Sequence, residues 1–240
     1  MGQYDLLIGN GCSFTEGGGL NNPQIFEFLT NKKQWGNNHK IFMQQNNWVA
    51  YLGEKLDLPW VNLSKSASSD DYIIQRSYDF CNKNLDKKIL LINQLSIKER
   101  LFFEKDGKPH SYHGGGKNVD GVWFGKLDSE IDNYYKSYIT EVFDNDYYYK
   151  TLQMKMDLFD AWCEDRLIDN YWITWEPLPF KTETLINFEL DSETNGIREW
   201  SKSKGLLLNQ IPNIPVDDAH LSLEGHKQVT NKIYKTITKI

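Results

Sequence analysis

Short apolar runs and longer stretches of helical periodicity alternate along the chain. The apolar runs end in glycine or polar residues, which is typical of buried strands in a parallel sheet. We expect such strands at residues 4–9, 60–63, 88–95 and 171–175, with a short fifth strand at 206–208. Helical spacing of apolar residues covers residues 47–56, 70–84 and 147–167 and resumes near residue 222. Ser69 or Asp70 is the expected N-cap of the second helix.

This alternation predicts an α/β fold in three layers, α/β/α, with helices on both faces of a central parallel sheet. The length of 240 residues fits a single domain, residues 1–240. In such sheets the ligand site lies beyond the carboxyl ends of the strands. The turn at Ser13 and segments 66–69 and 94–96 each follow an expected strand, so we expect them to meet at one edge.

Residues 101–146 break the alternation, and we interpret them as an insertion that rises from the same edge after the third strand. The insertion contains three glycines at 114–116 and many aromatic residues, unlike a disordered linker. It could act as a lid or as a platform on which a sugar stacks. Packing on the body of the protein or on a second subunit is an equal alternative, so the oligomeric state stays open.

Charge and composition narrow the classes of partner. The formal net charge of −6 and the lack of a basic stripe argue against a nucleic-acid backbone as the main partner. No apolar stretch approaches the ~20 residues of a membrane span, and the N-terminus lacks the basic and apolar regions of a signal peptide. The three cysteines are an odd number at unrelated spacings, as in a reducing compartment. These features predict a cytoplasmic protein.

A serine on a glycine-containing turn directly after the first strand is a candidate nucleophile. Ser13 lies in residues 11–15 (GCSFT), where the chain exposes its hydroxyl beside backbone N–H groups. A serine hydroxyl needs an imidazole as base, and a carboxylate must hold that imidazole in the right tautomer. His220 is the candidate base, and Asp217 is the candidate carboxylate, with Asp218 as second choice. Taken singly, Ser13 could cap a helix, and Asp217 and His220 could form a surface turn.

Four segments together resemble the sequence blocks of the SGNH (GDSL-like) hydrolases, esterases and lipases. In chain order the segments are residues 11–15, 62–70, 90–100 and 217–226. They follow the family order over nearly the whole chain, and the first and last are the specific ones. The resemblance implies an SGNH-hydrolase fold, similar to that of flavodoxin, and a serine esterase mechanism. It also implies Ser13 as nucleophile, His220 as base, an oxyanion hole, and no cofactor or metal.

Three positions depart from the family pattern. Cys12 replaces the aspartate usually found before the serine, which is a supporting position. Ala67 stands where a glycine N–H donates to the oxyanion, and its own N–H can donate if the backbone there needs no positive φ. Ser96, or Asn93 in a shifted register, stands at the asparagine that donates from its side chain. We therefore expect an oxyanion hole of Ser13, Ala67 and Ser96, with a weaker donor at Ser96.

Other motifs carry less chemistry. Glu176 follows the fourth strand and is a possible substrate contact, although an exposed turn is an equally good interpretation. His110 and His113 have no Cys, Asp or Glu at metal-ligand spacing, so we expect no metal site. The glycines at 17–19 lack the Lys-Ser/Thr ending of a P-loop and are interpreted as a flexible segment beside the site. His226 is interpreted as a structural residue of the last helix.

The sequence thus predicts a serine esterase that hydrolyses a small-molecule or glycan ester through an acyl-enzyme. An O-acyl group on a carbohydrate is the favoured substrate. The alternative is a binding module of the same fold for a glycan or a protein, weakened catalytically at Ala67 and Ser96. Neither hypothesis requires a cofactor.

Overall fold

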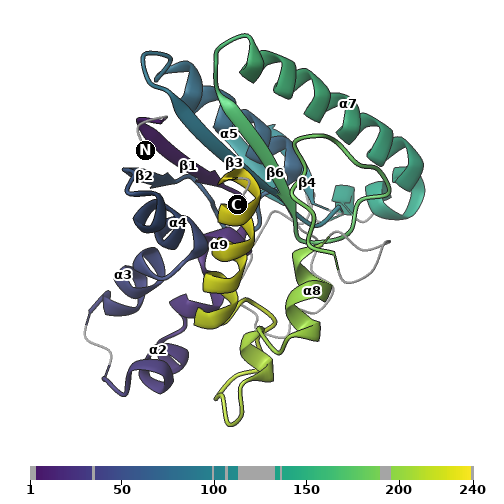
Figure 1. The fold of residues 1–240 in the computed structure, drawn as a ribbon. Helices are drawn as coiled ribbons and strands as arrows, with labels where there is room; N and C mark the ends of the chain where they lie inside the picture. Colours follow the sequence, from purple (N-terminus) through teal and green to yellow (C-terminus); the bar gives the residue numbers. More distant parts are fainter. Residues whose placement is uncertain are drawn as a thin grey trace.

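The computed structural model describes residues 4–33, 36–98, 100–105, 108–112, 133–135, 137–189 and 196–238. Four parallel strands form the central sheet in the order β2-β1-β3-β6 (Figure 1). Their bounds are Leu6–Asn10 for β1, Trp60–Asn62 for β2, Ile89–Leu95 for β3 and Asp169–Thr174 for β6. The four long strands predicted from the sequence are therefore confirmed.

Successive residues of the strands face opposite helical layers, because side chains alternate across a strand. Leu7 and Leu90 pack with α4 (Trp48–Leu56), α8 (Ile197–Ser203) and α9 (Leu223–Thr238) on one face. Ile8 and Leu91 pack with α5 (Asp70–Asn82) and α7 (Asn145–Glu164) on the other face. Figure 1 shows these helices on the two sides of the sheet, which confirms the predicted three layers.

The remaining elements include short helices that the apolar pattern did not predict. They are α1 (Ser13–Glu16), η1 (Gly18–Asn21), α2 (Pro23–Thr30), α3 (Asn38–Gln45) and η3 (Leu208–Gln210). The predicted fifth strand is wrong, because Leu207 forms only an isolated antiparallel bridge with Leu221. Leu206 and Leu207 pack outside the sheet, and Leu208 begins η3.

The predicted insertion is described only in part. It begins with an antiparallel hairpin of β4 (Leu101–Lys105) and β5 (Lys108–Tyr112). It ends with a π-helical turn, η2 (Tyr138–Val142), before α7. The glycines at 114–116 lie outside the described residues.

Local interactions fix where the helices begin and how closely they approach the sheet. The Ser69 hydroxyl accepts a hydrogen bond from Tyr72 N–H at the start of α5, which confirms the N-cap expected there. Gly9 in β1 permits the close approach of α4, since a Cβ at this position would lie 2.2 Å from Val49 Cγ2. The turn after β1 is thereby held near the start of α4.

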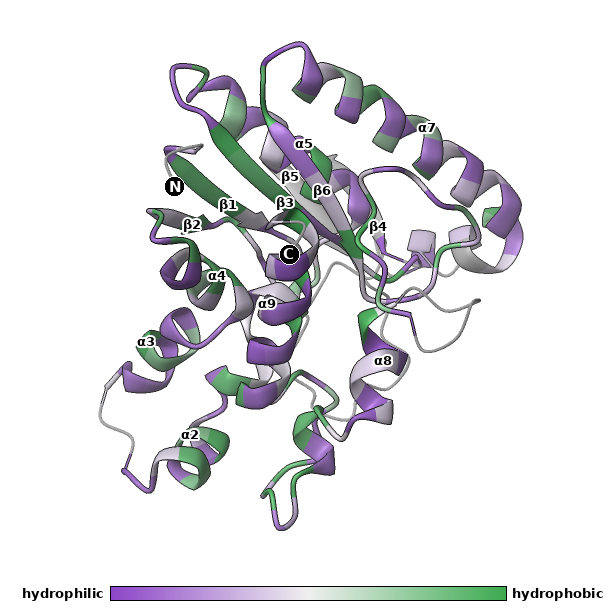
Figure 2. Ribbon diagram, viewed as in Figure 1, coloured by the Kyte–Doolittle hydropathy of each residue, from purple (hydrophilic) through white to green (hydrophobic). Residues whose placement is uncertain are grey.

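Figure 2 shows hydrophobic residues concentrated in the central strands β1 and β3, with hydrophilic residues interspersed along α7 and α9. Among the described residues, no helix combines the length and the apolar character that crossing a membrane requires.

Candidate active site

Ser13 is the first residue of α1 and directly follows the carboxyl end of β1. Its side chain is largely buried, with 4% of the residue exposed. The neighbouring residues hold this turn against β3. The Thr15 hydroxyl donates to Gln94 Oε1, and Gln94 Nε2 lies 3.9 Å from Cys12 Sγ. Cys12 is fully buried, in keeping with a supporting position.

His220 is paired with Asp218, not with the expected Asp217. The His220 Nδ1 to Asp218 Oδ1 distance is 2.5 Å, and the same oxygen accepts the His220 backbone N–H at 2.8 Å. Asp217 instead accepts a hydrogen bond from Asn209 Nδ2 at 3.2 Å. The reason is the backbone, because residues 217–220 are not helical and a side chain in a turn reaches the N–H two residues ahead. The expected contact between Asp217 and His220 is therefore wrong.

The surroundings of Asp218 favour its ionised form. Burial alone would raise the pKa of this carboxyl, but the hydrogen bonds and charge of His220 more than offset that effect. The net result is a pKa below the ordinary value for aspartate. A carboxylate at Nδ1 places a proton on that nitrogen and leaves Nε2 as the nitrogen able to accept one.

The Nε2 side of His220 faces the Ser13 turn. A Cβ at Gly18 would lie 3.0 Å from both His220 Nε2 and Ser13 Cβ, so these two atoms are at most about 6 Å apart, the sum of the two distances. No hydrogen bond joins the Ser13 hydroxyl to His220, although both residues are described. Such bonds are often long without substrate and shorten in the complex.

Aromatic rings support the imidazole. The Phe14 ring centroid lies 4.7 Å from that of His220, with an interplanar angle of 38°. Phe14 also stacks on Trp175, with ring centroids 3.5 Å apart and an interplanar angle of 7°. Phe14 contacts the His220 ring and is itself held by Trp175, so together they limit how the His220 ring can move. Sequence reasoning missed both contacts, since they join segments far apart in the chain.

Ala67 adopts the backbone conformation that a glycine would favour. Its φ is +65°, and Ser68 N–H bonds to Lys65 O at 3.2 Å across the turn. A positive φ at the third residue of such a turn is the geometry of type II, where glycine is the usual choice. Ala67 N–H is an expected oxyanion donor on the condition that φ is not positive, and the structure does not meet that condition. The residue carries a strain of about 1 kcal/mol.

The side chains of Ser96 and Asn93 have partners elsewhere. Ser96 Oγ accepts a hydrogen bond from Arg100 Nη1 at 2.6 Å. Asn93 donates to Asn170 Oδ1 at 3.0 Å and accepts from Ser77 Oγ at 2.6 Å. Neither side chain bonds to the Ser13 turn. The third oxyanion donor expected from the resemblance is therefore not brought to the serine by either residue.

Glu176 and His226 lie near the same edge. Glu176 Oε1 is 3.5 Å from Arg198 Nη1, an ion pair at the start of α8. Its role as a substrate contact stays a prediction. His226 is buried in the first turn of α9, and burial together with the nearby His220 lowers its pKa to about 3. In the described part of the chain, no cluster of three metal-ligating side chains occurs.

Solved structures that are similar to the chain include lipolytic hydrolases and esterases. A protein assigned to the lipolytic G-D-S-L family from Desulfitobacterium hafniense is 14% identical, with a TM-score of 0.47, over 96% of this chain and 98% of its own. Esterase EstA from Pseudoalteromonas sp. is 11% identical, with a TM-score of 0.46, over 98% of this chain and 97% of its own. A GDSL-like lipase from Bacteroides thetaiotaomicron is 11% identical, with a TM-score of 0.40, over 98% of this chain and 88% of its own.

No family model matches the sequence, and no curated protein matches it. We therefore base the proposed function on the geometry of Ser13, His220 and Asp218.

Proposed function

We propose that the protein is a serine ester hydrolase. The observation that carries the proposal is the placement of His220 between Asp218 and Ser13. Asp218 Oδ1 lies 2.5 Å from Nδ1, and Nε2 is at most about 6 Å from Ser13 Cβ, because each would lie 3.0 Å from a Cβ at Gly18. A nucleophile, a base and an orienting carboxylate in this order match the requirements for acyl transfer.

In the proposed reaction His220 Nε2 takes the Ser13 hydroxyl proton as Oγ attacks the ester carbonyl. The tetrahedral intermediate collapses when the ester C–O bond breaks, and His220 returns its proton to the leaving alcohol. A water molecule then attacks the acyl-enzyme with His220 again as base, which releases the carboxylic acid and regenerates Ser13. Asp218 stabilises the imidazolium that forms in both steps.

The proposed oxyanion donors are the backbone N–H groups of Ser13 and Ala67. The positive φ of Ala67 strains the residue but does not remove its N–H, so we keep it as a donor in this proposal. Ser96 Oγ accepts a hydrogen bond from Arg100 and is not joined to the Ser13 turn among the described residues, so we expect no side-chain donor to the oxyanion from that position. Loss of one oxyanion donor costs about 10²–10³ in turnover. We therefore expect slow hydrolysis of simple esters. An O-acyl carbohydrate remains the favoured substrate, since exposed aromatic residues of the insertion such as Tyr134 are suited to stacking on a sugar.

Turnover of p-nitrophenyl acetate by Ser13→Ala tests this proposal. Activity should disappear while the thermal unfolding temperature stays near that of the wild type, because the substitution removes one hydroxyl. Ser203→Ala is the matched control, since Ser203 bonds only within α8 and should leave turnover unchanged. Equal turnover in the wild type and Ser13→Ala would remove Ser13 from the mechanism.

A second candidate function is a binding module with a weakened site. The observation that favours it is that Ser96 and Asn93 are both engaged away from Ser13. Such a module would bind an acylated oligosaccharide equally well in the wild type and in Ser13→Ala, and neither protein would hydrolyse it. Release of the acid by the wild type alone would decide for the enzyme.

A further inference from the structure

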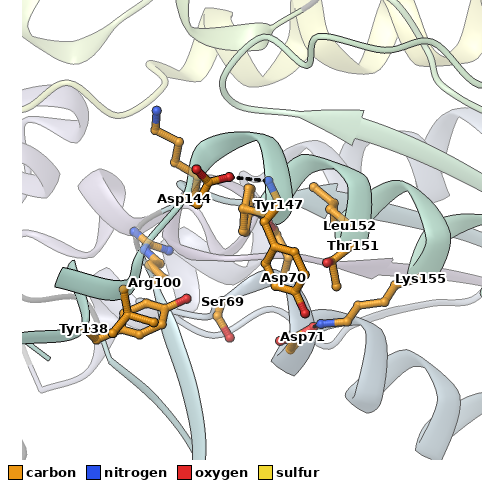
Figure 3. Close-up of a pocket in the computed structure, with 13 residues that line it drawn as sticks. Ser69, Asp70, Asp71, Arg100, Tyr138, Asp144, Tyr147, Thr151, Leu152 and Lys155 are labelled. Carbon is orange, nitrogen blue, oxygen red and sulfur yellow. Dashed lines mark hydrogen bonds and ion pairs between the residues drawn. The ribbon is translucent and has the colours of Figure 1, made fainter. Parts of the chain in front are cut away.

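A cavity of about 360 Å³ lies between the start of α5, the start of α7 and the segment that follows β3. Ser13, His220 and Asp218 are not among the residues that line it. Figure 3 shows Arg100 and Tyr138 on one side of the cavity, with Tyr147, Thr151 and Leu152 along α7 on the other. The mechanism proposed above does not use this cavity.

The carboxylates in the wall are already occupied by donors of the protein itself. The pairs are Asp70 with Ser96 N–H at 2.7 Å and with the Tyr148 hydroxyl, Asp71 with Lys155 Nζ at 2.5 Å, and Asp144 with Tyr147 N–H at 2.7 Å. Burial is the largest influence on Asp70 and raises its pKa above the ordinary value, although its hydrogen bonds and Arg100 oppose the shift. The acidic groups therefore oppose a bound anion less than their number suggests.

Arg100 has hydrogen-bonding capacity that the described residues do not use. Its Nη1 donates to Ser68 O at 3.0 Å and to Ser96 Oγ at 2.6 Å, and both of these acceptors are neutral. Its Nε is buried and has no hydrogen-bond partner among the described residues. Within the same part of the chain, no carboxylate lies at ion-pair distance from the guanidinium. The edge formed by Nε and Nη2 is the edge that binds a planar oxyanion through two parallel hydrogen bonds.

The N-termini of two helices border the same place, and their own acidic residues already offset part of the positive potential there. Ser69 caps α5 and Asp144 caps α7, and both caps line the cavity. The N-terminus of a helix carries a partial positive charge, which favours an anion. Lys98 also lines the cavity, and it donates to Asn145 Oδ1 at 2.9 Å. In a chain of net charge −6, this concentration of donors is a local feature.

We propose that this cavity binds a small organic oxyanion, a carboxylate or a phosphate monoester, at the Nε and Nη2 edge of Arg100. The rings of Tyr138 and Tyr147 and the side chain of Leu152 border the space for the organic part of the ligand. Recognition of the oxyanion does not require the Ser13 hydroxyl. Whether the oxyanion is carried by the ester substrate or by a separate ligand does not change its recognition.

Calorimetric titration of the full chain with benzoate, phenyl phosphate and benzamide tests the proposal. Benzamide has nearly the shape of benzoate without its charge. At least one of the two anions should bind, and benzamide should bind at least about tenfold more weakly, since charge-assisted hydrogen bonds are the stronger ones. The ratio between benzoate and phenyl phosphate identifies the preferred oxyanion. Equal binding of benzoate and benzamide, or no binding of either anion, would overturn the proposal.

Variants locate the binding. Arg100→Gln should lower the affinity for the preferred anion by about tenfold or more, because the bidentate pair is lost. Arg166→Gln is the matched control, since Arg166 pairs with Asp165 outside the cavity. This variant should bind the preferred anion with the affinity of the wild type. Unchanged affinity in Arg100→Gln would contradict the assignment.

Arg100 also bonds to Ser68 and Ser96, so its replacement can disturb the fold. Tyr147→Ala provides a second test, because this residue lines the cavity and is 73% exposed. It should remain folded and bind the anion severalfold more weakly. Ser13→Ala should bind like the wild type, which separates failure of this proposal from failure of the ester hydrolase proposal.

Discussion

The buried polar groups between the sheet and α5 are organised differently from the polar groups at the edge of the sheet that carries Ser13. On the α5 face of the sheet, side-chain amides and a hydroxyl form a continuous chain of hydrogen bonds. It runs from Asn10 through Ser77, Asn93 and Asn170 to Asp160, with donor–acceptor distances from 2.6 to 3.0 Å. Each step in this chain is a completed hydrogen bond. Such a network rigidifies the core and is costly to interrupt.

At the serine edge, in contrast, the residues are brought close without a completed chain of bonds. Asp218 and His220 form a tight pair, whereas Ser13 approaches His220 across Gly18 without a hydrogen bond. Ala67, in the neighbouring turn, is held at a positive φ. Strain and incomplete bonding are typical of positions that serve a ligand and not stability. We therefore expect substitutions at the edge to affect turnover and substitutions in the network to affect stability.

The largest effect should come from Asp218. Asp218→Asn should lower kcat for an activated ester by about 10⁴, because an amide no longer selects the correct tautomer of His220 or stabilises its charge. Asp217→Asn is the matched control and should leave kcat near that of the wild type. Stopped-flow or steady-state kinetics with p-nitrophenyl acetate measures both. A larger loss in Asp217→Asn than in Asp218→Asn would contradict the assignment of the carboxylate.

Asn93 tests the difference between the two regions. It belongs to the buried hydrogen-bonded network, and the family resemblance also allows it as an oxyanion donor. Asn93→Ala should lower the free energy of unfolding by about 2 kcal/mol, since Ser77 and Asn170 each lose a partner in a buried site. Its kcat below the unfolding transition should stay within severalfold of the wild type. Denaturant titration and kinetics on the same preparation give both values. A hundredfold loss of kcat in the folded variant would place Asn93 in the site after all.

His226 should make stability depend on pH. Its folded pKa of about 3 is lower than the ordinary value of 6.5, so the unfolded chain binds a proton that the folded protein excludes. Stability is therefore full above the ordinary value and is lost as the pH falls toward 3. At pH 5 the loss from this group is about 2 kcal/mol. His226→Gln should unfold with a smaller pH dependence than the wild type. An unchanged pH dependence in His226→Gln would show that other groups cause it.

Ala67 should give the smallest effect, and one of opposite sign. Ala67→Gly should raise the free energy of unfolding by about 0.5–1 kcal/mol, because glycine adopts positive φ without the steric cost that alanine has. The gain is reduced by the greater freedom of glycine in the unfolded chain. Turnover should be retained, since the proposed donor is the backbone N–H. Chemical denaturation measures the change, and destabilisation would mean that the Ala67 methyl group makes a favourable contact.

The sequence predicted the parts of the fold that depend on local pattern. The long apolar runs gave the four strands, and the polar cap at Ser69 gave the start of α5. The run at 206–208 was misinterpreted, because the same short pattern suits a strand or a packed loop. The helices α2 and α3 were missed between the first two strands, where no clear periodicity marks them.

The site was predictable to the level of its motifs but not of its contacts. Ser13 and His220 could be paired from their positions after a strand and before the last helix. The choice of Asp217 assumed a helical turn, whereas Asp218 can fold back on the His220 N–H in an extended loop. The bond from Arg100 to Ser96 depends on how the segment after β3 folds. No spacing in the sequence reports that interaction.

Peptide mapping by mass spectrometry after reaction with a fluorophosphonate tests the central claim most directly, because the reagent labels only an activated serine. We predict one phosphonyl adduct per chain, located on Ser13, and much slower labelling of Asp218→Asn than of Asp217→Asn. An adduct on another serine, or a wild-type protein that remains unlabelled, would contradict the assignment of Ser13, His220 and Asp218 as one catalytic unit.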